Sequence, residues 1–379
     1  MSPVPALLPT YAPFPFNLAR GEGDRIFDDQ GGAWMDCYGG HCVCGTGHGH
    51  PAVVEAIIAQ AKTLPFYSAA GDLAIRHEAA ARLTAFAGMA SAFFCNSGAE
   101  ANESALKVAI QLTGRKKLAA FEGAFHGRTL LALSATDEAS LQSPLQGLLA
   151  PVTRLPFNDS ASLDAADFSE LAAVIVEPIQ SMAGVRVASD AWLAALRAKC
   201  DASGSLLIFD EVQTGMGRLG SPFAAHHFGV KPDLITAAKS LASGVPMGAL
   251  LMSESIAAAL KPGDLGSTFG GGPLACAALI ATLKVITGET LMARALEAES
   301  FLRNQIQGTD VRAIRGAGLL LGLETGDAAA LKAHLFARRI LAGSSKDPRV
   351  LRLMPPLTLT DASLAALVEA IHTYRAEAA

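Results

Sequence analysis

Short apolar runs recur through the middle of the chain, and amphipathic stretches separate several of them. Four runs are typical of buried β-strands: residues 172–176 (AAVIV), 205–209 (SLLIF), 234–238 (LITAA) and 248–252 (GALLM). Residues 191–199, between the first two runs, have helical spacing instead. Strands that are apolar on both faces occur in parallel sheets with helices on each side, so this alternation predicts an α/β fold.

Helical spacing also marks the two flanks of this region. After Pro51, which suits the first turn of a helix, apolar residues recur with the helical period as far as Leu64. Residues 361–376 have the same kind of pattern. The chain has 379 residues, more than the roughly 150 of one typical domain. We expect a large domain over residues 51–288 and a small domain over residues 289–379, with residues 1–50 contributing to the small domain and the active-site edge.

The composition limits the classes of partner. Charged residues make up 17% of the chain, below the roughly 25% usual in soluble domains, so we expect an oligomer that hides part of the surface. A net charge of -5 gives no general attraction to nucleic acid. No apolar run approaches the roughly 18 residues that cross a bilayer, and the first sixteen residues lack the basic start of a secretory signal. We expect a cytoplasmic protein without a membrane or nucleic-acid partner.

Residues 41–50 (HCVCGTGHGH) hold two cysteines and three histidines. In an extended segment Cys42 and Cys44 would lie roughly 6.6 Å apart along the strand, whereas zinc usually takes cysteines from a tight turn. No second cluster follows that could complete four ligands. We therefore expect no metal here, but a glycine-rich loop that passes close to another group.

A helix with small residues in its first turn is predicted after Ser97. Ser97 and Glu100 form a capping-box pattern, and apolar residues then follow helical spacing. Gly98 and Ala99 leave backbone N–H groups open to an anion, for which phosphate is the natural candidate. An ordinary helix cap is the alternative interpretation.

Two charged residues follow predicted strands. Asp210 comes after the run 205–209, and Lys239 comes after the run 234–238. A desolvated lysine can form a Schiff base with an aldehyde, and a carboxylate can keep a pyridine nitrogen protonated. With a phosphate site at the helix start, the two residues match the needs of pyridoxal phosphate. Alone, Asp210 would be explained as a helix cap and Lys239 as a solvated strand end.

The motifs around these residues resemble those of the class III, pyridoxal-phosphate-dependent aminotransferases of fold type I, and most closely those of acetylornithine and succinylornithine aminotransferases. The resemblance extends from about residue 11 to the C-terminus through NSGAEANE (96–103), FHGRT (125–129), VEPIQ (176–180), FDEVQTGMGR (209–218), PDLITAAKS (232–240), GSTFGGGP (266–273) and LRLMPPL (351–357). It implies a large domain with a mainly parallel seven-stranded sheet covered by helices, and a smaller α+β domain. It also implies transfer of the distal amino group of N-acetylornithine, or of a related acylated diamino acid, to 2-oxoglutarate in arginine biosynthesis. An ornithine, 4-aminobutyrate or lysine aminotransferase is the alternative.

The resemblance implies roles for individual residues around pyridoxal 5'-phosphate. Lys239 is implied as the lysine that binds the cofactor and carries the proton, and Asp210 as the partner of the pyridinium nitrogen. The other implied contacts are Gln213 at the ring oxygen, Val212 and Phe125 on the two ring faces, and Ser97, Gly98 and Ala99 at the phosphate. Thr268 from the partner subunit is implied to complete the phosphate site, which makes the protein a homodimer with shared active sites.

Substrate contacts follow from the same resemblance. It implies Arg128 and Ser267 as contacts and Arg352 as the carboxylate-binding arginine, since a planar guanidinium suits a carboxylate. Glu177 is implied as a carboxylate behind the residues that touch the cofactor.

Two other interpretations compete with an aminotransferase. Residues 215–220 (GMGRLG) fit the G-x-G-x-x-G pattern of NAD-dependent dehydrogenases. However, residues 211–214 separate these glycines from the strand, and Pro222 stands where a long helix should begin. A non-enzymatic metal-binding module built on residues 41–50 is the second alternative.

The sequence departs from the family pattern at two places. Gly272 stands where the family commonly has Asn, and Ser181-Met182 follows EPIQ where Gly-Glu is usual. In ω-aminotransferases of the family, that glutamate is thought to pair with the arginine that corresponds to Arg352 and to release it when glutamate binds. Because Met182 cannot accept such a hydrogen bond, we expect Arg352 to stay available to carboxylates. These two departures leave the identity of the physiological amino donor undecided.

Overall fold

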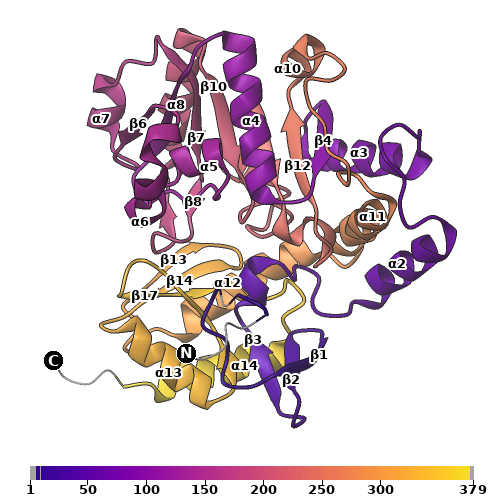
Figure 1. The fold of residues 1–379 in the computed structure, drawn as a ribbon. Helices are drawn as coiled ribbons and strands as arrows, with labels where there is room; N and C mark the ends of the chain where they lie inside the picture. The colour runs from indigo at the N-terminus through magenta and orange to yellow at the C-terminus, as the bar shows by residue number, and fades with distance from the viewer. Residues whose placement is uncertain (1–5, 9, 376–379) are drawn as a thin grey trace.

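The computed structural model describes residues 6–8 and 10–375 and has two lobes (Figure 1). The upper lobe contains a seven-stranded sheet. Its strands, in spatial order, are β4 (Ser91–Cys95), β12 (Gly248–Met252), β11 (Leu234–Ala237), β10 (Leu206–Asp210), β7 (Leu171–Val176), β5 (Lys117–Phe121) and β6 (Val152–Leu155). All run in one direction except β12, which is antiparallel to both neighbours. The predicted mainly parallel sheet is confirmed, with the run 248–252 as its reversed strand.

Both faces of this sheet are covered, which explains why its strands are apolar throughout. On β7 every residue is buried. Val174 packs in the same cluster as Trp192 of α8 (Asp190–Ser203), whereas the next residue, Ile175, packs with Leu106 of α4 (Gly98–Thr113) on the opposite face. Alternate side chains of one strand therefore reach two separate helix layers.

The remaining elements of the upper lobe lie around the sheet (Figure 1). They are α2 (Pro51–Thr63), α3 (Ala74–Ala87), α5 (Leu130–Ala135), α6 (Ala139–Gln142), η1 (Ser143–Leu148), α7 (Ser160–Ala165), β8 (Ile179–Gln180), β9 (Arg186–Val187), α9 (Ala224–His227), η2 (Lys239–Ala242), α10 (Glu254–Ala259) and α11 (Pro273–Gly288). Within the described residues, no single helix is long and apolar enough to cross a membrane; only the bent pair of α11 and α12 (Leu291–Gln305) meets those criteria together.

The lower lobe combines the two ends of the chain. Its main sheet is antiparallel, in the order β13 (Ala313–Ala317), β14 (Leu320–Glu324), β17 (Val350–Leu353) and β16 (Gly343–Ser344). The N-terminal strands β1 (Leu18–Glu22), β2 (Arg25–Asp28) and β3 (Ala33–Asp36) form a second sheet with β15 (Ile340–Leu341), where Met35 pairs with Ile340. Helices α13 (Ala328–Ala337) and α14 (Asp361–Thr373) complete the lobe. The predicted last helix ends early, because Tyr374 is extended; residue 376 lies outside the described residues.

A buried carboxylate beside the strand end gives the fold a pH dependence. Glu211 is 1% exposed and accepts hydrogen bonds from Ala225 N (2.9 Å), Ala224 N and the Thr214 hydroxyl (3.1 Å). Burial raises the pKa of the Glu211 carboxyl to about 7, although these donors oppose the rise. The folded state therefore binds a proton that the unfolded chain releases above its ordinary pKa of 4.5.

We expect this carboxyl to add stability at low pH that is lost as the pH rises from about 4.5 through 7. The loss is roughly 3 to 3.5 kcal/mol, since the pKa rises from 4.5 to about 7 and each pH unit between these values is worth about 1.36 kcal/mol. Melting temperatures from pH 5 to pH 8 should fall less steeply for Glu211→Gln than for the wild type, because the amide does not titrate. Parallel curves for the two proteins would show that Glu211 is ionised in the fold.

Candidate active site

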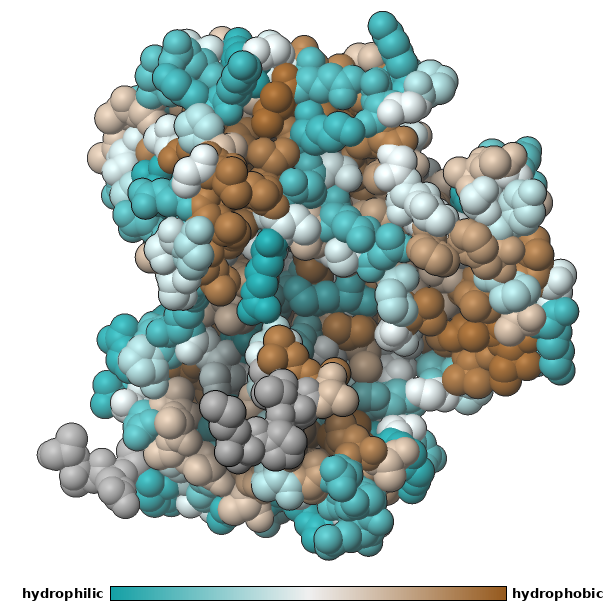
Figure 2. Space-filling model, viewed as in Figure 1, coloured by the Kyte–Doolittle hydropathy of each residue, from teal (hydrophilic) through white to brown (hydrophobic). Residues whose placement is uncertain are grey.

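A cavity of about 490 Å³ lies at the edge where the carboxyl ends of β4, β7, β10 and β11 meet. Its lining includes Asn96, Glu177, Asp210 and Lys239, each of which ends or follows one of these strands. Figure 2 shows the surface hollowed between the two lobes. The topology thus brings together residues that are far apart in the sequence.

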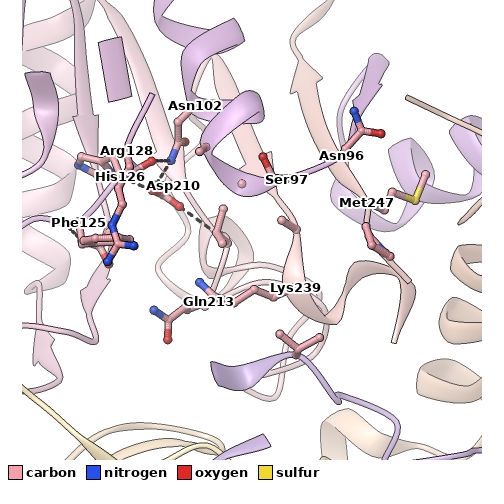
Figure 3. A pocket seen from close by; sticks show the side chains of 18 of the residues that line it. Asn96, Ser97, Asn102, Phe125, His126, Arg128, Asp210, Gln213, Lys239 and Met247 are labelled. Atoms are coloured by element: carbon pink, nitrogen blue, oxygen red, sulfur yellow. Dashed lines mark hydrogen bonds and ion pairs between the residues drawn. The ribbon is translucent and has the colours of Figure 1, made fainter. Parts of the chain in front are cut away.

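Asp210, the last residue of β10, is 4% exposed and held by three donors. Its Oδ2 accepts hydrogen bonds from Asn102 Nδ2 (2.8 Å) and His126 Nδ1 (2.7 Å), and its Oδ1 accepts one from Val212 N (3.1 Å). Figure 3 shows Asn102 and His126 converging on Asp210. The carboxylate is therefore fixed in direction as well as in place.

Asn102 and His126 were assigned no role from the sequence. Asn102 Nδ2 also donates to His126 O (2.7 Å), and its Oδ1 accepts from the Thr236 hydroxyl (2.6 Å). The side chain of His126 is fully buried. Asn102 lies in the motif NSGAEANE and His126 in the motif FHGRT. A polar side chain among apolar and small neighbours in these motifs was the sequence signal that could have identified them.

Lys239 follows β11 and begins the short helix η2 in a left-handed conformation, with φ of 50°. Burial lowers the pKa of the Lys239 ammonium, while the nearby Asp210 and Glu177 favour the charged form. Figure 3 shows the side chains of Lys239 and Gln213 close together below Asp210. A lysine in this setting supplies an amine that is readily uncharged and thus nucleophilic.

The start of α4 forms a cradle of backbone groups at the cavity wall. The Ser97 hydroxyl accepts from Glu100 N (3.2 Å), as the capping box predicts, and Glu100 Oε2 accepts from Asn96 N (2.6 Å). Gly98 has no room for a side chain, since a Cβ there would lie 2.9 Å from Val212 Cγ2. The helix start and Val212 therefore pack closely, and Ser97, Gly98 and Ala99 all line the cavity.

Phe125, Gln213 and Glu177 lie around the same space. Phe125 N donates to Glu177 Oε1 (2.9 Å). Burial raises the pKa of the Glu177 carboxyl to about 7, against the influence of His126. The Gln213 Oε1 atom is buried and has no hydrogen-bond partner in the described part of the chain, so the amide is open to a polar group in the cavity.

The two arginines implied as substrate contacts differ in exposure: Arg128 is exposed and Arg352 is buried. Arg128 is exposed at the cavity and its guanidinium is 6.0 Å from the Phe125 ring centre. Arg352 of β17 is 4% exposed; its Nη1 donates to the Ser181 hydroxyl (2.9 Å) and its Nε to Ser344 O (2.7 Å). Burial lowers the pKa of Arg352. The side-chain partner of Arg352 is thus a neutral hydroxyl, one residue before Met182.

Ser267 and Thr268 lie in the loop before α11. The Ser267 hydroxyl accepts from Asn96 Nδ2 (3.2 Å), which places it at the cavity edge. Thr268 is exposed and is not among the residues that line the cavity of its own chain. Gly272 caps the N-terminus of α11.

Residues 39–42, at the start of the loop 41–50, take a form that the sequence did not indicate, whereas the GMGRLG segment departs from the dinucleotide-binding motif as its sequence indicated. Residues 39–42 form a tight left-handed turn instead of an extended segment. No three His, Cys, Asp or Glu side chains of the described residues are grouped to hold a metal ion. Residues 215–220 lie in turns, and the helix that follows, α9, has four residues. That helix is too short for the dinucleotide-binding motif.

A lysine and a fixed carboxylate at the carboxyl end of a parallel sheet, beside a cradle of N–H groups, define a site for a pyridine-type cofactor with a phosphate. The sequence model of the class-III aminotransferases matches residues 8–374, and the chain belongs to this family. The acetylornithine aminotransferase of Methanopyrus kandleri is 42% identical over 376 residues, covering 97% of this chain and 96% of that protein.

Solved structures agree with this fold. The ornithine aminotransferase from Toxoplasma gondii ME49 superimposes with a TM-score of 0.90 at 31% identity, covering 97% of this chain and 91% of that chain. The acetylornithine aminotransferase from Elizabethkingia anophelis has a TM-score of 0.83 at 32% identity, covering 96% and 94%. The protein is a fold type I, pyridoxal-phosphate-dependent aminotransferase, so the dehydrogenase and metal-module interpretations are wrong.

Proposed function

We propose that the protein transfers the distal amino group of N-acetylornithine, or of a related acylated diamino acid, to 2-oxoglutarate, giving the semialdehyde and glutamate. The observation that carries the proposal is the cavity lined by Lys239 and Asp210 at the sheet edge, with the buried Arg352 near enough to Lys239 to add to the effect of burial in lowering the pKa of its ammonium. The names of relatives about 40% identical over nearly the whole chain support the acylated donor.

Each residue has a defined task in this proposal. When bound, pyridoxal phosphate supplies an aldehyde that condenses with amines and a ring that accepts electrons. Lys239 would hold it covalently and would carry the proton at the substrate, Asp210 would hold the ring nitrogen, and Gln213 would contact the ring oxygen. Val212 and Phe125 would hold the ring between them, and Ser97, Gly98 and Ala99 would bind the phosphate.

A second set of residues is proposed to bind the substrate. Arg352 captures a carboxylate, Arg128 and Ser267 contact the substrate at the cavity mouth, and the buried Glu177 holds the backbone of Phe125 in place. Turnover of acetylornithine, succinylornithine, ornithine and 4-aminobutyrate with 2-oxoglutarate tests the donor. Faster use of ornithine or 4-aminobutyrate than of both acylated donors would favour the alternative ω-aminotransferase.

We also propose a homodimer with shared active sites. An exposed apolar surface joins α2 to the loop that carries Thr268. It consists of Val54, Ile58, Phe66, Tyr67 and Phe269, with the Phe66 and Phe269 rings 4.9 Å apart. Figure 2 shows apolar side chains gathered over the region of α2. Burying this surface would carry Thr268 into the partner's site, where its hydroxyl would bind the phosphate.

Mixed dimers test this arrangement. Thr268→Val should weaken cofactor binding about tenfold, because one hydrogen bond to a charged phosphate is lost. Mixing Thr268→Val subunits with Lys239→Ala subunits should restore normal affinity at the sites that contain Lys239, since these receive Thr268 from the other subunit. Unchanged weak binding in the mixed dimers would show that Thr268 acts within its own chain or not at all.

The partner of Arg352 gives a prediction for glutamate. Met182→Glu should give Arg352 a competing carboxylate and weaken capture of glutamate by on the order of 1–3 kcal/mol, the scale of a hydrogen bond to a charged group. Single-turnover conversion of the aldehyde form by glutamate measures this. Met182→Gln, which has similar size without charge, is the control, and equal affinities in both variants would show that residue 182 does not act on Arg352.

Three further parts of the proposal concern context. We propose a place in arginine biosynthesis, because the donor is an acylated diamino acid, and a location in the cytoplasm. We also propose that the chain divides into a large domain (51–288) and a small domain (289–379), and that residues 1–50 join the small domain. The pairing of β3 with β15 supports this last assignment.

A further inference from the structure

Arg76 is a half-buried arginine in the first turn of α3 that binds backbone carbonyl groups. Its guanidinium donates from Nε to Gly271 O (3.0 Å), from Nη1 to Gly71 O (3.1 Å) and from Nη2 to Tyr67 O (3.1 Å). Among the residues that the structure describes, no Asp or Glu forms an ion pair with Arg76. Because a guanidinium carries five N–H donors in one plane, it can hold several segments at once.

The carbonyl groups belong to two segments of the apolar surface proposed for the dimer. The first segment lies just before α3. The second, called here the arm, is residues 267–271 in the loop before α11, and its Gly271 is 195 positions from Arg76 in the sequence. The rings of Phe66 and Phe269, one from each segment, are 4.9 Å apart. Arg76 therefore ties together two distant parts of the surface that a partner subunit would cover.

The arm carries Thr268 and is fixed at both ends. At its start, the Ser267 hydroxyl accepts a hydrogen bond from Asn96 Nδ2 (3.2 Å). At its end, Gly271 O accepts the hydrogen bond from Arg76 Nε (3.0 Å). The exposed Thr268 lies between these two anchors, so its direction depends on both.

The two anchors stand in different relations to the cavity of their own chain. Asn96 lines that cavity, so a change at Asn96 disturbs the chain's own cofactor site directly. Arg76 is not among the described residues that line the cavity. A change at Arg76 therefore reaches a cofactor site only through the segments that Arg76 holds.

We propose that Arg76 is a positioning residue for the partner subunit's cofactor site, where it fixes the arm so that Thr268 meets the phosphate. The inference rests on the shared active sites proposed above. Without the bond to Gly271 O the arm is held at one end only, so Thr268 must be ordered when the cofactor binds, and this ordering costs affinity. Lysine cannot take over the role, because an ammonium lacks the planar fork that spans the two segments.

The first test is the dissociation constant of pyridoxal phosphate for the cofactor-free protein, which needs no turnover. Arg76→Met, which keeps the length without the donors, should weaken binding about fivefold, within the roughly tenfold expected for loss of the Thr268 hydrogen bond itself. Arg76→Lys keeps the charge and should weaken binding nearly as much. Arg82→Met is the matched control, because Arg82 lies on the same helix but pairs with the Glu78 carboxylate (2.7 Å). Wild-type affinity in either Arg76 variant would overturn the proposal.

A double variant separates positioning from a general loss of stability. Arg76→Met added to Thr268→Val should weaken cofactor binding no further than Thr268→Val alone, because the arm then has no hydroxyl to place. Losses that multiply in the double variant would show that Arg76 acts independently of Thr268, and would overturn the proposal.

Mixed dimers show which subunit's site depends on Arg76. When a subunit with Arg76→Met and Lys239→Ala pairs with a wild-type subunit, the site that contains Lys239 receives Thr268 from the altered arm and should bind about fivefold more weakly. When an Arg76→Met subunit pairs with a Lys239→Ala subunit, the site that contains Lys239 receives an intact arm and should bind normally. Borohydride fixes the cofactor onto Lys239, so these sites are counted separately, and sedimentation checks that each species is a dimer.

Normal binding in the first mixed dimer, or weak binding in the second, would show that Arg76 does not act on the partner's site. The Thr268→Val mixed dimers test the shared sites themselves. If those dimers fail to restore affinity, the proposed sharing of sites fails. If they restore affinity while the Arg76 dimers do not behave as expected, only the role of Arg76 is overturned.

Discussion

Lys239→Ala is expected to lower kcat for transamination at least about 1000-fold while the fold is retained. The substitution removes the amine that binds the cofactor and the group that moves the proton, and proton transfer by a positioned side chain alone is worth about 10²–10⁴-fold. The side chain is buried in the cavity and forms no ion pair within the described residues, so unfolding should not explain the loss.

Single-turnover assays with glutamate measure the effect, and borohydride treatment followed by peptide mapping reports where the cofactor is attached. Lys231→Ala, an exposed lysine away from the cavity, is the control and should keep wild-type turnover. Transamination by purified Lys239→Ala at a rate near that of the wild type would refute the proposed mechanism.

Asp210→Asn is expected to lower kcat about 100-fold or more, with a smaller effect on KM. A neutral amide no longer stabilises a protonated pyridine ring, and preorganised electrostatic groups of this kind are typically worth about 10²–10³-fold. The new amide would also direct a donor at Asn102 Nδ2 or His126 Nδ1, which now donate to the Asp210 carboxylate.

Steady-state kinetics measure the changes in kcat and KM, and a cofactor titration shows whether the variant still binds the cofactor. Glu211→Gln alters the adjacent carboxylate, which faces α9 and not the cavity, and should keep most of the wild-type kcat. If Asp210→Asn also keeps most of its kcat, Asp210 serves only to hold Asn102 and His126.

Local patterns predicted the elements and much of the site. The strand runs were visible because both faces of β7 and its neighbours are buried, and the cap at Ser97 was visible because it depends on Glu100, three residues away. The end of each strand was enough to place Asp210 and Lys239. These features depend on residues close together in the chain.

Features that depend on distant segments were not predictable in the same way. The contact between His126 and Asp210 joins residues 84 positions apart, and that between Ser181 and Arg352 joins residues 171 positions apart. The reversed direction of β12 depends on its path between β11 and β4, which its apolar pattern does not record. The left-handed turn at residues 39–42 departs from the usual preference of His and Cys, so propensity argued against it.

The pairing of β3 with β15 sets the order in which the protein can be completed during synthesis. Met35 leaves the ribosome about 300 residues before its partner Ile340, an interval of roughly 15–60 s at about 5–20 residues per second. Until then β3 has β2 on one edge and no partner on the other. The segment that follows β3 and includes the left-handed turn at residues 39–42 is therefore among the last to settle, so a nascent chain gains its large sheet well before it gains a finished catalytic pocket.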